Sequence, residues 1–344
     1  MLGKIFFYIL LIVLCCNCTQ SSKNAKHFNF SKNMNNVHDK INEIVIEDVL
    51  ISGASALYLM DQYLIIIDTK ATDNVIHLFD KNDFSYITST GERGQGPKEI
   101  TNPGGIGVNE ADRIFYVNDN GKNLIYCFNL DSVLSKSNYF PKETVKMNKT
   151  IIPDDYQYYN DTLSIGQFII YLGNGDYRPS AAKWNMRTGE ITLMNKYDHP
   201  KIENKRTSFA ASFEHGVFVE SYHYHDLLSI SDLDGNLISY IYGNKWNDIR
   251  QNTFRFFGKS AFCKDKIAVL YRDGNNTRDV DKEGRREYCP ANFVIFNIHG
   301  DYIQTLETGY NQILRFCYDN DNNRIIMLLD DIIQFAYLDL DGIV

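Results

Sequence analysis

One phrase recurs six times along this chain and limits what the chain can fold into. Each copy is a short apolar run closed by Asp or Asn, followed by a tight turn and a second apolar run. Repeats of this length that hold three or four short strands each are typical of β-propeller blades. The pattern therefore predicts an all-β fold, a six-bladed β-propeller. The closing residues are Asp80, Asn129, Asn185, Asp232, Asn297 and Asp339, at intervals of 49, 56, 47, 65 and 42 residues.

The apolar runs have the length of strands rather than helices. Most are five to seven residues long, and no window of 12 residues shows a helical period. Tyr (23) and Phe (21) are abundant, which also favours strands. In the first repeat we expect strands at 54–59, 63–68, 75–80 and 84–89, and in the fourth at 209–213, 217–222, 227–232 and 237–242.

The last repeat is one strand short. It offers strands at 313–318, 324–329 and 332–338, and the sequence then ends at Val344. A spare strand at 43–51 precedes the first repeat, and pairing it with the last repeat closes the ring and removes exposed sheet edges. We therefore expect residues 41–344 to form the propeller, with the N-terminal strand completing the sixth blade.

The first 18 residues resemble an export signal. Lys4 precedes an apolar run over 5–14, which is too short to span a bilayer. The run ends in Cys15-Cys16-Asn17-Cys18, which resembles the lipobox of bacterial lipoproteins. We expect acylation of Cys16, with Cys18 as the alternative and an unacylated secretory signal as the competing interpretation. Residues 19–40 are rich in Ser, Asn and Lys, and we expect a flexible tether there.

A glycine run, Gly91-Glu92-Arg93-Gly94-Gln95-Gly96-Pro97, looks at first like a phosphate-binding loop. Such a loop opens a helix, whereas two prolines and two further glycines border or follow this run within Pro97 to Gly105. We interpret the run as a connector between two blades.

The same run carries a family resemblance. Together with Glu99 it resembles the Gly-x-x-Gly-x-Gly-Pro-x-Glu motif of TolB-like or NHL-like six-bladed propeller lipoproteins of Bacteroidetes. The resemblance covers most of residues 41–344, and its specific motif lies in the first hundred residues. It implies a lipid-anchored protein of the bacterial cell envelope, at the outer membrane and facing the periplasm or the surface. It implies no catalytic residue.

The net charge and composition of the chain limit the classes of partner that it can bind. A net charge of −8 leaves no basic face for nucleic acid. The sequence shows no cofactor motif, no catalytic serine motif and no metal-ligand spacing of Cys and His. We expect a module that binds an envelope protein or a glycan, and we name a polysaccharide lyase or glycoside hydrolase as the alternative.

The candidate binding face comes from the topology expected of a propeller. Loops between blades and loops between second and third strands share one face, and long loops often carry function. The segments 91–104, 173–179, 222–226 and 273–290 fall there. The candidate residues on this face are Arg93, Gln95, Lys98, Tyr177, Arg178, Tyr222, His223, Tyr224, His225 and Asp226.

Three finer hypotheses concern this face. His223 and His225 alternate on an extended chain and are a weak candidate for metal binding, although we expect no metal. Tyrosines 156, 158, 159, 171 and 177, with Arg178, are a candidate platform for stacking sugars, although tyrosine is also an ordinary strand residue. The insertion at 273–287 holds five acidic and four basic residues, and a solvated loop is favoured over a lid or partner contact.

Overall fold

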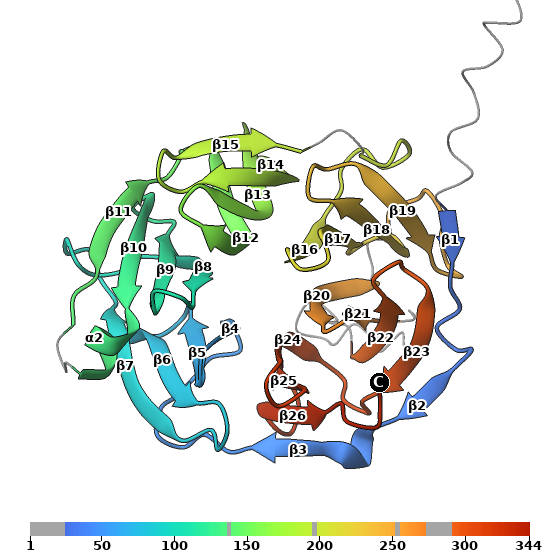
Figure 1. The fold of residues 1–344 in the computed structure, drawn as a ribbon, viewed down its shortest axis with the longest axis horizontal. Coiled ribbons are helices and arrows are strands. Elements are labelled where there is room, and N and C mark those ends of the chain that lie inside the picture. The colour runs from blue at the N-terminus through green and yellow to red at the C-terminus, as the bar shows by residue number, and fades with distance from the viewer. Residues whose placement is uncertain (1–24, 136–138, 195–197, 252–254, 273–290) are drawn as a thin grey trace, which may run out of the picture.

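The computed structural model describes residues 25–135, 139–194, 198–251, 255–272 and 291–344. Six antiparallel sheets stand around a central axis like the blades of a propeller, as the sequence predicts (Figure 1). The signal predicted over residues 1–18 and the insertion at 273–287 lie outside the described residues.

Each blade is built in chain order from its inner to its outer strand. Blade 1 holds β4 (Ser55–Met60), β5 (Tyr63–Asp68), β6 (Asn74–Asp80) and β7 (Tyr86–Glu92), and blade 2 holds β8 (Pro103–Asn109), β9 (Ile114–Asp119), β10 (Leu124–Asn129) and β11 (Lys142–Lys146). Blade 3 holds β12 (Ile151–Asn160), β13 (Leu163–Gly173), β14 (Asp176–Asn185) and β15 (Glu190–Leu193). Blade 4 holds β16 (Thr207–Ser212), β17 (Val217–Tyr222), β18 (Leu227–Asp232) and β19 (Leu237–Tyr242), and blade 5 holds β20 (Phe257–Cys263), β21 (Lys266–Tyr271), β22 (Asn292–Asn297) and β23 (Tyr302–Glu307). Blade 6 holds β24 (Ile313–Asp319), β25 (Arg324–Leu329) and β26 (Phe335–Asp339).

The six residues that define the repeat all end the third strand of a blade. In five of them a side-chain oxygen accepts a backbone hydrogen bond from two or three residues further along, in a turn in four blades and in a short helix after Asn129. Examples are Asp80 Oδ1 from Asn82 N at 2.7 Å and Asp232 Oδ1 from Asp234 N at 2.9 Å. Asp and Asn suit this position because their short side chains form such turns. The repeat in the sequence therefore reflects Asp and Asn side chains that accept backbone hydrogen bonds just after the third strand of a blade.

The ring closes as predicted, with an N-terminal strand in the last blade. β3 (Ile41–Ile44) pairs antiparallel with β26, from Phe335↔Ile44 to Leu338↔Ile41. The strand is shorter than the predicted 43–51 and begins two residues earlier. It gives blade 6 its fourth strand and covers an edge that would otherwise be exposed.

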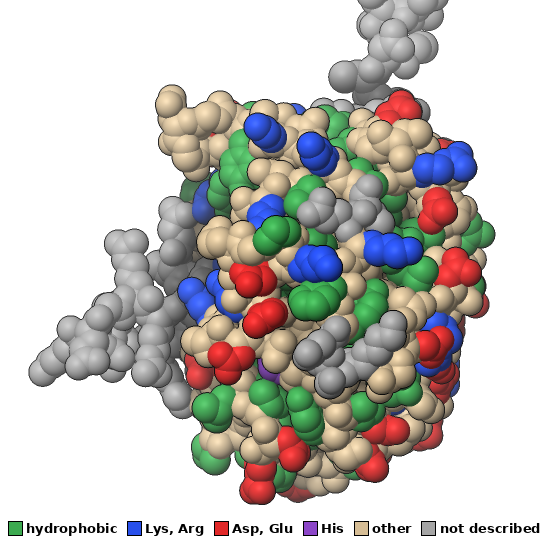
Figure 2. All heavy atoms as spheres, turned by 90° about the vertical axis from the view of Figure 1, so that its left-hand side faces the viewer, with side chains coloured by type: hydrophobic (Ala, Val, Ile, Leu, Met, Phe, Trp, Pro, Cys, Tyr) green, Lys and Arg blue, Asp and Glu red, His purple; other side chains and the backbone are tan. Residues whose placement is uncertain are grey.

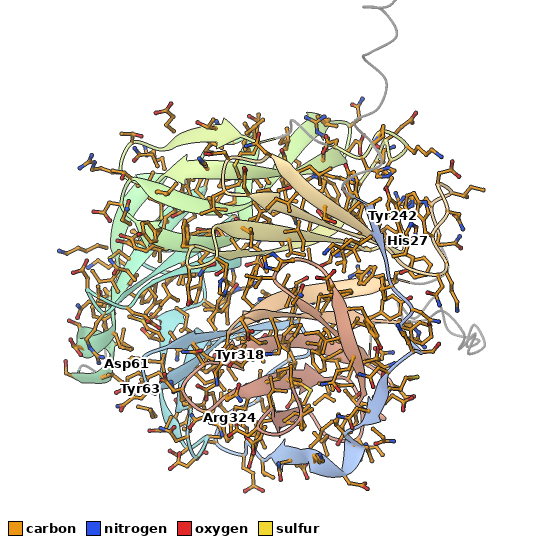
Figure 3. The ribbon with its side chains drawn as sticks, turned by 45° about the vertical axis from the view of Figure 1, so that its right-hand side comes forward. His27, Asp61, Tyr63, Tyr242, Tyr318 and Arg324 are labelled. Atoms are coloured by element: carbon orange, nitrogen blue, oxygen red, sulfur yellow. The ribbon has the colours of Figure 1, made fainter. Side chains whose placement is uncertain are left out.

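The segment before β3 differs from the tether predicted for residues 19–40. β1 (Ala25–His27) pairs parallel with β19, β2 (Met34–Asn36) pairs parallel with β23, and the short 3-10 helix η1 (His38–Lys40) leads to β3. Residues 25–40, here called the strap, thus run along the outer edges of blades 4 and 5 (Figure 1). His27 stacks on Tyr242 at 5.4 Å between ring centroids (Figure 3). Backbone pairing to two sheet edges, together with the burial of Phe28 and Val37 in the core, holds the strap in spite of its polar composition.

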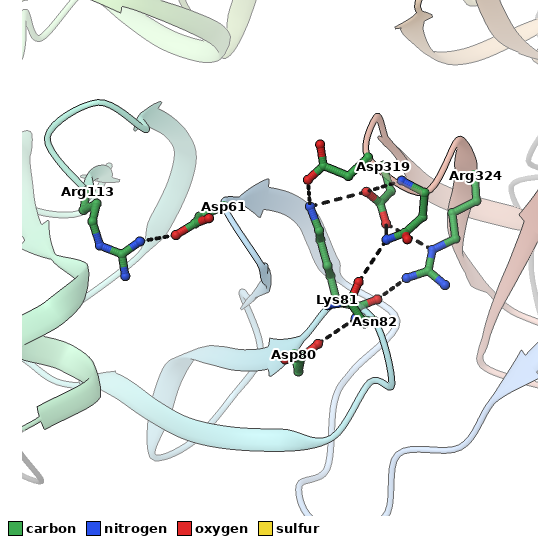
Figure 4. Close-up of polar contacts among 9 residues, drawn as sticks. Asp61, Asp80, Lys81, Asn82, Arg113, Asp319 and Arg324 are labelled. Atoms are coloured by element: carbon green, nitrogen blue, oxygen red, sulfur yellow. Dashed lines mark hydrogen bonds and ion pairs between the residues drawn. The ribbon is translucent and has the colours of Figure 1, made fainter.

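Between blades, apolar side chains form the core and polar contacts link the rims. One cluster joins Met60, Ile65 and Phe115 across blades 1 and 2, and the short helix α2 (Leu130–Ser135) covers it with Leu130 and Val133. An ion pair joins Arg113 to Asp61 across the same pair of blades (Figure 4). On the side of the molecule turned to the viewer in Figure 2, side chains of both charge signs are mixed with apolar ones.

A buried charged cluster fixes the seam between blades 6 and 1. Asp319, at the end of β24, lies 3.0 Å from Arg324 Nε and 3.5 Å from Lys81 Nζ of blade 1, and Arg324 also donates to the backbone oxygen of Lys81 (Figure 4). The Arg324 guanidinium lies over the rings of Phe84 and Tyr337, at 4.8 and 5.0 Å. These contacts tie the last blade to the first.

No helix among the described residues is long and apolar enough to cross a membrane.

Candidate ligand-binding site

The topology gives the propeller two different faces. Inner strands all begin at one face, where the connectors between blades and the loops from second to third strands also lie, and we call it the connector face. The other face carries the remaining hairpin turns, and we call it the hairpin face. The candidate segments 91–104, 173–179 and 222–226 all lie on the connector face, in agreement with the predicted topology.

Two cavities lie along the axis and meet inside the ring. A cavity of about 360 Å³ opens among the first residues of the inner strands, and a cavity of about 650 Å³ lies among their last residues. We call them the connector cavity and the hairpin cavity. Both are lined by Tyr58, Asp155, Phe209 and Lys259, so these four residues form the waist of a central channel. Concave sites of this size are typical of small-ligand binding.

The hairpin cavity is rich in aromatic and aliphatic side chains. Tyr159 is 58% exposed and stacks on Phe213 at 4.5 Å between centroids, and Phe262 and Tyr318 line the same space. Lys259 at the waist lies 5.5 Å from the centre of the Tyr58 ring.

At the waist, two adjacent carboxylates have different environments. Asp155 lies 3.8 Å from Lys259 Nζ in an ion pair. Asp154 faces the connector cavity and accepts a hydrogen bond from Gln167 Nε2 at 3.1 Å, and Gln167 in turn accepts one from Thr207 Oγ1 at 2.7 Å. Asp154 is open to the cavity, and desolvation by the surrounding cavity walls, and then the charge of Asp155, raise its pKa. Its carboxyl therefore holds a proton more readily than an ordinary aspartate.

His223 is the one predicted site residue that lines the connector cavity. Its Nε2 and Ser208 Oγ share a hydrogen bond of 2.8 Å. Burial, and then the charges of Arg255, Arg315 and Arg206, lower the pKa of His223 to about 3. The imidazole is therefore neutral at physiological pH. The charges of the three arginines also make the electrostatic potential around it positive.

The other members of the 222–226 segment are directed into blade 4. Tyr222, His225 and Asp226 are buried, with exposures of 1%, 5% and 1%, so they do not contribute to an exposed face. Tyr222 packs with Leu227 and other apolar residues of blade 4. Tyr224 is half-buried, with the Arg250 guanidinium 4.2 Å above its ring.

His223 and His225 have separate surroundings. His223 bonds to Ser208 in the channel, whereas His225 lies near Trp246 at 6.0 Å between ring centroids. No group of three or more His, Cys, Asp or Glu residues placed to hold a metal ion occurs in the described ranges.

Arg93, Gln95 and Lys98 lie in the connector from blade 1 to blade 2, away from the axial cavities. Arg93 donates to the backbone oxygen of Thr69 at 3.0 Å, Lys98 lies 4.7 Å above the ring of Phe140, and Gln95 is exposed. Arg93 and Lys98 line a separate pocket of about 440 Å³ with Phe140.

The glycine run itself has a structural role. Glu99 folds back so that its Oε2 accepts from Gly96 N at 2.6 Å, and a Cβ on Gly94 would lie 1.9 Å from that carboxylate. Lys122 Nζ donates to the backbone oxygens of Gly96 and Glu99, at 2.5 and 2.6 Å. The glycines leave room for the glutamate that fixes the connector, which explains the spacing of the motif.

The predicted tyrosines divide between the two ends of the channel. Tyr171 and Tyr177 are cross-strand neighbours at the tip of the β13–β14 hairpin on the connector face, with exposures of 50% and 37%. The Arg206 guanidinium lies 4.0 Å above the ring of Tyr177. Arg178, next to Tyr177, is half-buried. Tyr159 lies at the hairpin cavity.

The prediction from sequence missed the basic residues of the channel. Arg206, Arg255 and Arg315 each stand at or near the start of the inner strand of blade 4, 5 or 6. They share no fixed position in the repeat, since they lie 26, 42 and 24 residues before Asp232, Asn297 and Asp339, so the repeat pattern does not reveal them.

Comparisons with known proteins agree on the fold. A model of the DUF5128 family, described as a six-bladed β-propeller, matches residues 17–168. The chain is similar to the structure of a DUF4221 family member from Bacteroides vulgatus, with a TM-score of 0.60 and 9% identity over 88% of this chain and 98% of that one. It is also similar to a luciferin-regenerating enzyme, with a TM-score of 0.55 and 10% identity over 86% and 94% of the two chains. No protein of curated function matches it significantly. At such identities the likeness shows the fold alone: the chain is a six-bladed β-propeller.

Proposed function

We propose that this six-bladed β-propeller is a glycan-binding module of the bacterial cell envelope, held at the outer membrane by an acyl chain on Cys16, or on Cys18 in the alternative. The export-signal pattern of residues 1–18 supports the location, and the resemblance to propeller lipoproteins of Bacteroidetes agrees with it. Mass spectrometry of the mature N-terminus tests the anchor, and an unacylated terminus refutes it.

The observation that carries the binding role is the exposed Tyr171–Tyr177 pair on the connector face, which contacts Arg206, the residue directly before Thr207 of the connector cavity. Aromatic faces pack on the C–H groups of sugars, and the connector cavity of about 360 Å³ accepts one or two sugar units.

A glycan array probed with the full-length chain in detergent micelles tests this role. We expect Tyr171→Ala and Tyr177→Ala to weaken binding about tenfold each, because each removes a stacking surface. Tyr159→Ala is the matched control, since it removes an exposed tyrosine from the opposite face. Binding of no glycan, or equal losses in all three variants, contradicts the proposal.

One observation favours the alternative, a polysaccharide lyase or glycoside hydrolase. Asp154 and Asp155 are adjacent carboxyl groups in the channel, and the pKa of Asp154 is raised while Asp155 is paired with Lys259. A bound glycan incubated with the protein should then be cleaved, and Asp154→Asn should abolish cleavage while leaving binding intact. An uncleaved glycan rules out this alternative for that ligand.

A further inference from the structure

The second axial cavity, on the hairpin face, is walled mainly by aromatic side chains. Six aromatic residues that keep exposed surface line it, and five of the six blades contribute at least one of them. Blade 2 contributes Ile106, Val108 and Glu110 instead. Aromatic side chains therefore surround this cavity of about 650 Å³ on most of its circumference. The six are Tyr58, Tyr158, Tyr159, Phe213, Phe262 and Tyr318.

The hydroxyl groups of two of these tyrosines are already bonded within the protein. Tyr158 donates to Asp161 Oδ1 at 2.6 Å, and Tyr318 donates to Asn323 Oδ1 at 2.7 Å. A third tyrosine, Tyr159, is 58% exposed and stacks on Phe213. What these side chains offer a ligand is therefore mainly their rings.

The single cation among the residues that line the cavity is already neutralised. The ammonium group of Lys259 lies 3.8 Å from the carboxylate of Asp155 in an ion pair. It also lies 5.5 Å from the centre of the Tyr58 ring, where the negative face of an aromatic ring attracts a cation. The protein's own ammonium group thus already uses one ring of this cavity.

Two carboxylates at the mouth of the cavity are not neutralised in this way. Glu110 and Glu214 line the cavity and are exposed, and neither forms an ion pair with a described residue. The turns between first and second strands hold seven carboxylates and two cations, Arg113 and Lys264, and Arg113 is paired with carboxylates of neighbouring loops. The mouth therefore carries an excess of negative charge. These turns are residues 61–62, 110–113, 161–162, 213–216, 264–265 and 320–323.

Negative charge around a concave aromatic space favours one class of ligand. A cleft lined by charge of one sign concentrates ligands of the opposite sign. Aromatic faces bind ammonium groups, above all quaternary ones, which shed water easily. A metal ion needs several ligating side chains, and no group of three or more His, Cys, Asp or Glu suited to one occurs in the part of the chain that the structure describes. The combination therefore favours an organic cation over a metal ion or an anion.

From this arrangement we infer that the hairpin cavity is a second binding site and takes an organic ammonium ion, with the cationic head against the aromatic side chains and the carboxylates of Glu110 and Glu214 at the mouth. The site opens on the face opposite the proposed glycan site. The inference therefore goes beyond the glycan-binding role and does not depend on it.

The experiment is calorimetry of the full-length chain in maltoside micelles, whose head groups carry no charge. The probes are acetylcholine and 3,3-dimethylbutyl acetate, in which carbon replaces the quaternary nitrogen, so the two differ in charge and hardly in shape. We expect the cation to bind at least tenfold more tightly, because a cation–π contact in a partly enclosed site is worth about that factor. This preference should shrink as the salt concentration rises, because salt screens the exposed carboxylates.

Three variants assign the effect to the cavity. Glu110→Gln and Glu214→Gln should each weaken acetylcholine about threefold, as expected for exposed charges, and leave the neutral probe unchanged. Tyr159→Leu keeps an apolar side chain and removes a ring, so it should weaken only the cation, also about threefold. Glu203→Gln is the matched control, since it removes an exposed carboxylate from the connector face.

The outcomes decide the inference without involving the glycan. Equal affinity for the two probes, or binding of neither, overturns it, and this comparison uses the unaltered protein. A loss with Glu203→Gln as large as those with Glu110→Gln and Glu214→Gln also overturns it, because the net charge of the chain then explains the preference. None of these results changes the outcome of the glycan array, so the two proposals fail separately.

Discussion

The seam between blades 6 and 1 provides a demanding test of how the ring is held together. Asp319 has no exposed surface and contacts two nearly buried cations, Arg324 and Lys81 (Figure 4). Asp319→Ala leaves both cations buried without their shared carboxylate. Breaking a buried pair in this way typically costs about 3–5 kcal/mol, because Arg324 has lost its water and its carboxylate partner, whereas Lys81 keeps the exposed Asp321. We expect a loss of about that size in the free energy of unfolding.

The assay is thermal unfolding of the full-length chain in micelles, followed by tryptophan fluorescence and circular dichroism. Unfolding entropies near 2 cal/mol/K per residue, over roughly 320 residues, convert such a loss into a decrease of about 5–7 °C in Tm. Asp234→Ala is the control, since Asp234 also pairs across blades, with Lys183 at 2.5 Å, but is 74% exposed. The control should cost less than about 1 kcal/mol.

The contribution of the same seam to stability should depend on pH. Burial alone would raise the pKa of Asp319, but hydrogen bonds from Asn322 and the charges of Lys81 and Arg324 outweigh burial and lower it below the ordinary 3.8. A lowered folded pKa gives stability that is fully present above the unfolded pKa and is lost as pH falls through the folded one. The advantage of the native chain over Asp319→Asn should therefore be constant from pH 7 to 5 and shrink below about pH 4. Equal Tm losses for Asp319→Ala and Asp234→Ala would refute the reasoning.

Three further predictions follow from packing, burial and pairing. A Cβ on Gly105 would lie 2.3 Å from a backbone oxygen of β12, so Gly105→Ala should cost about 1–3 kcal/mol in denaturant unfolding, whereas Gly53→Ala, facing only a side-chain tip at 3.3 Å, should be nearly neutral. Burial raises the pKa of Asp226 to about 6, so its ionisation costs stability as pH rises from about 4 to 7. Asp226→Asn should gain up to about 3 kcal/mol over the native chain at pH 8 and little at pH 3, and a difference independent of pH contradicts this. Removing residues 25–36 should lower Tm and leave the molecular mass in solution equal to that of the native protein. Also removing 41–44 opens the ring at β26 and should cause aggregation, visible by light scattering.

Much of the fold was predictable because its signals are local. Asp80 and Asp232 end strands and bond to their own turns, so the repeat is visible without any tertiary contact. The strands of blade 4 at 217–222, 227–232 and 237–242 agree with the structure residue for residue. The missing fourth strand of blade 6 followed from counting strands, since a closed ring needs a partner for each edge.

The strap was not predictable by the same means. Ala25–His27 and Met34–Asn36 are short and polar, and they have neither the alternation nor the length of an ordinary strand. They are ordered because the outer edges of β19 and β23 offer unpaired backbone groups at the place where the chain passes. This pairing leaves no pattern in the side chains of the two strands, and the apolar signal of the strap is limited to isolated residues such as Phe28 and Val37, which are buried in the core.

The sequence by itself determined the six repeats, the turns that end their third strands and the closure of the ring, because period and turn chemistry act over a few residues. It also placed the candidate segments on one face, because that follows from topology. Only the tertiary structure decided which side chains meet on the axis: it buries Tyr222 and Asp226 inside blade 4 and brings Arg255 and Arg315 together with His223 from three different blades. Which side chains meet on the axis depends on how each blade is rotated and on how long its insertions are. A local pattern within one repeat contains neither the rotation nor the effect of the insertions.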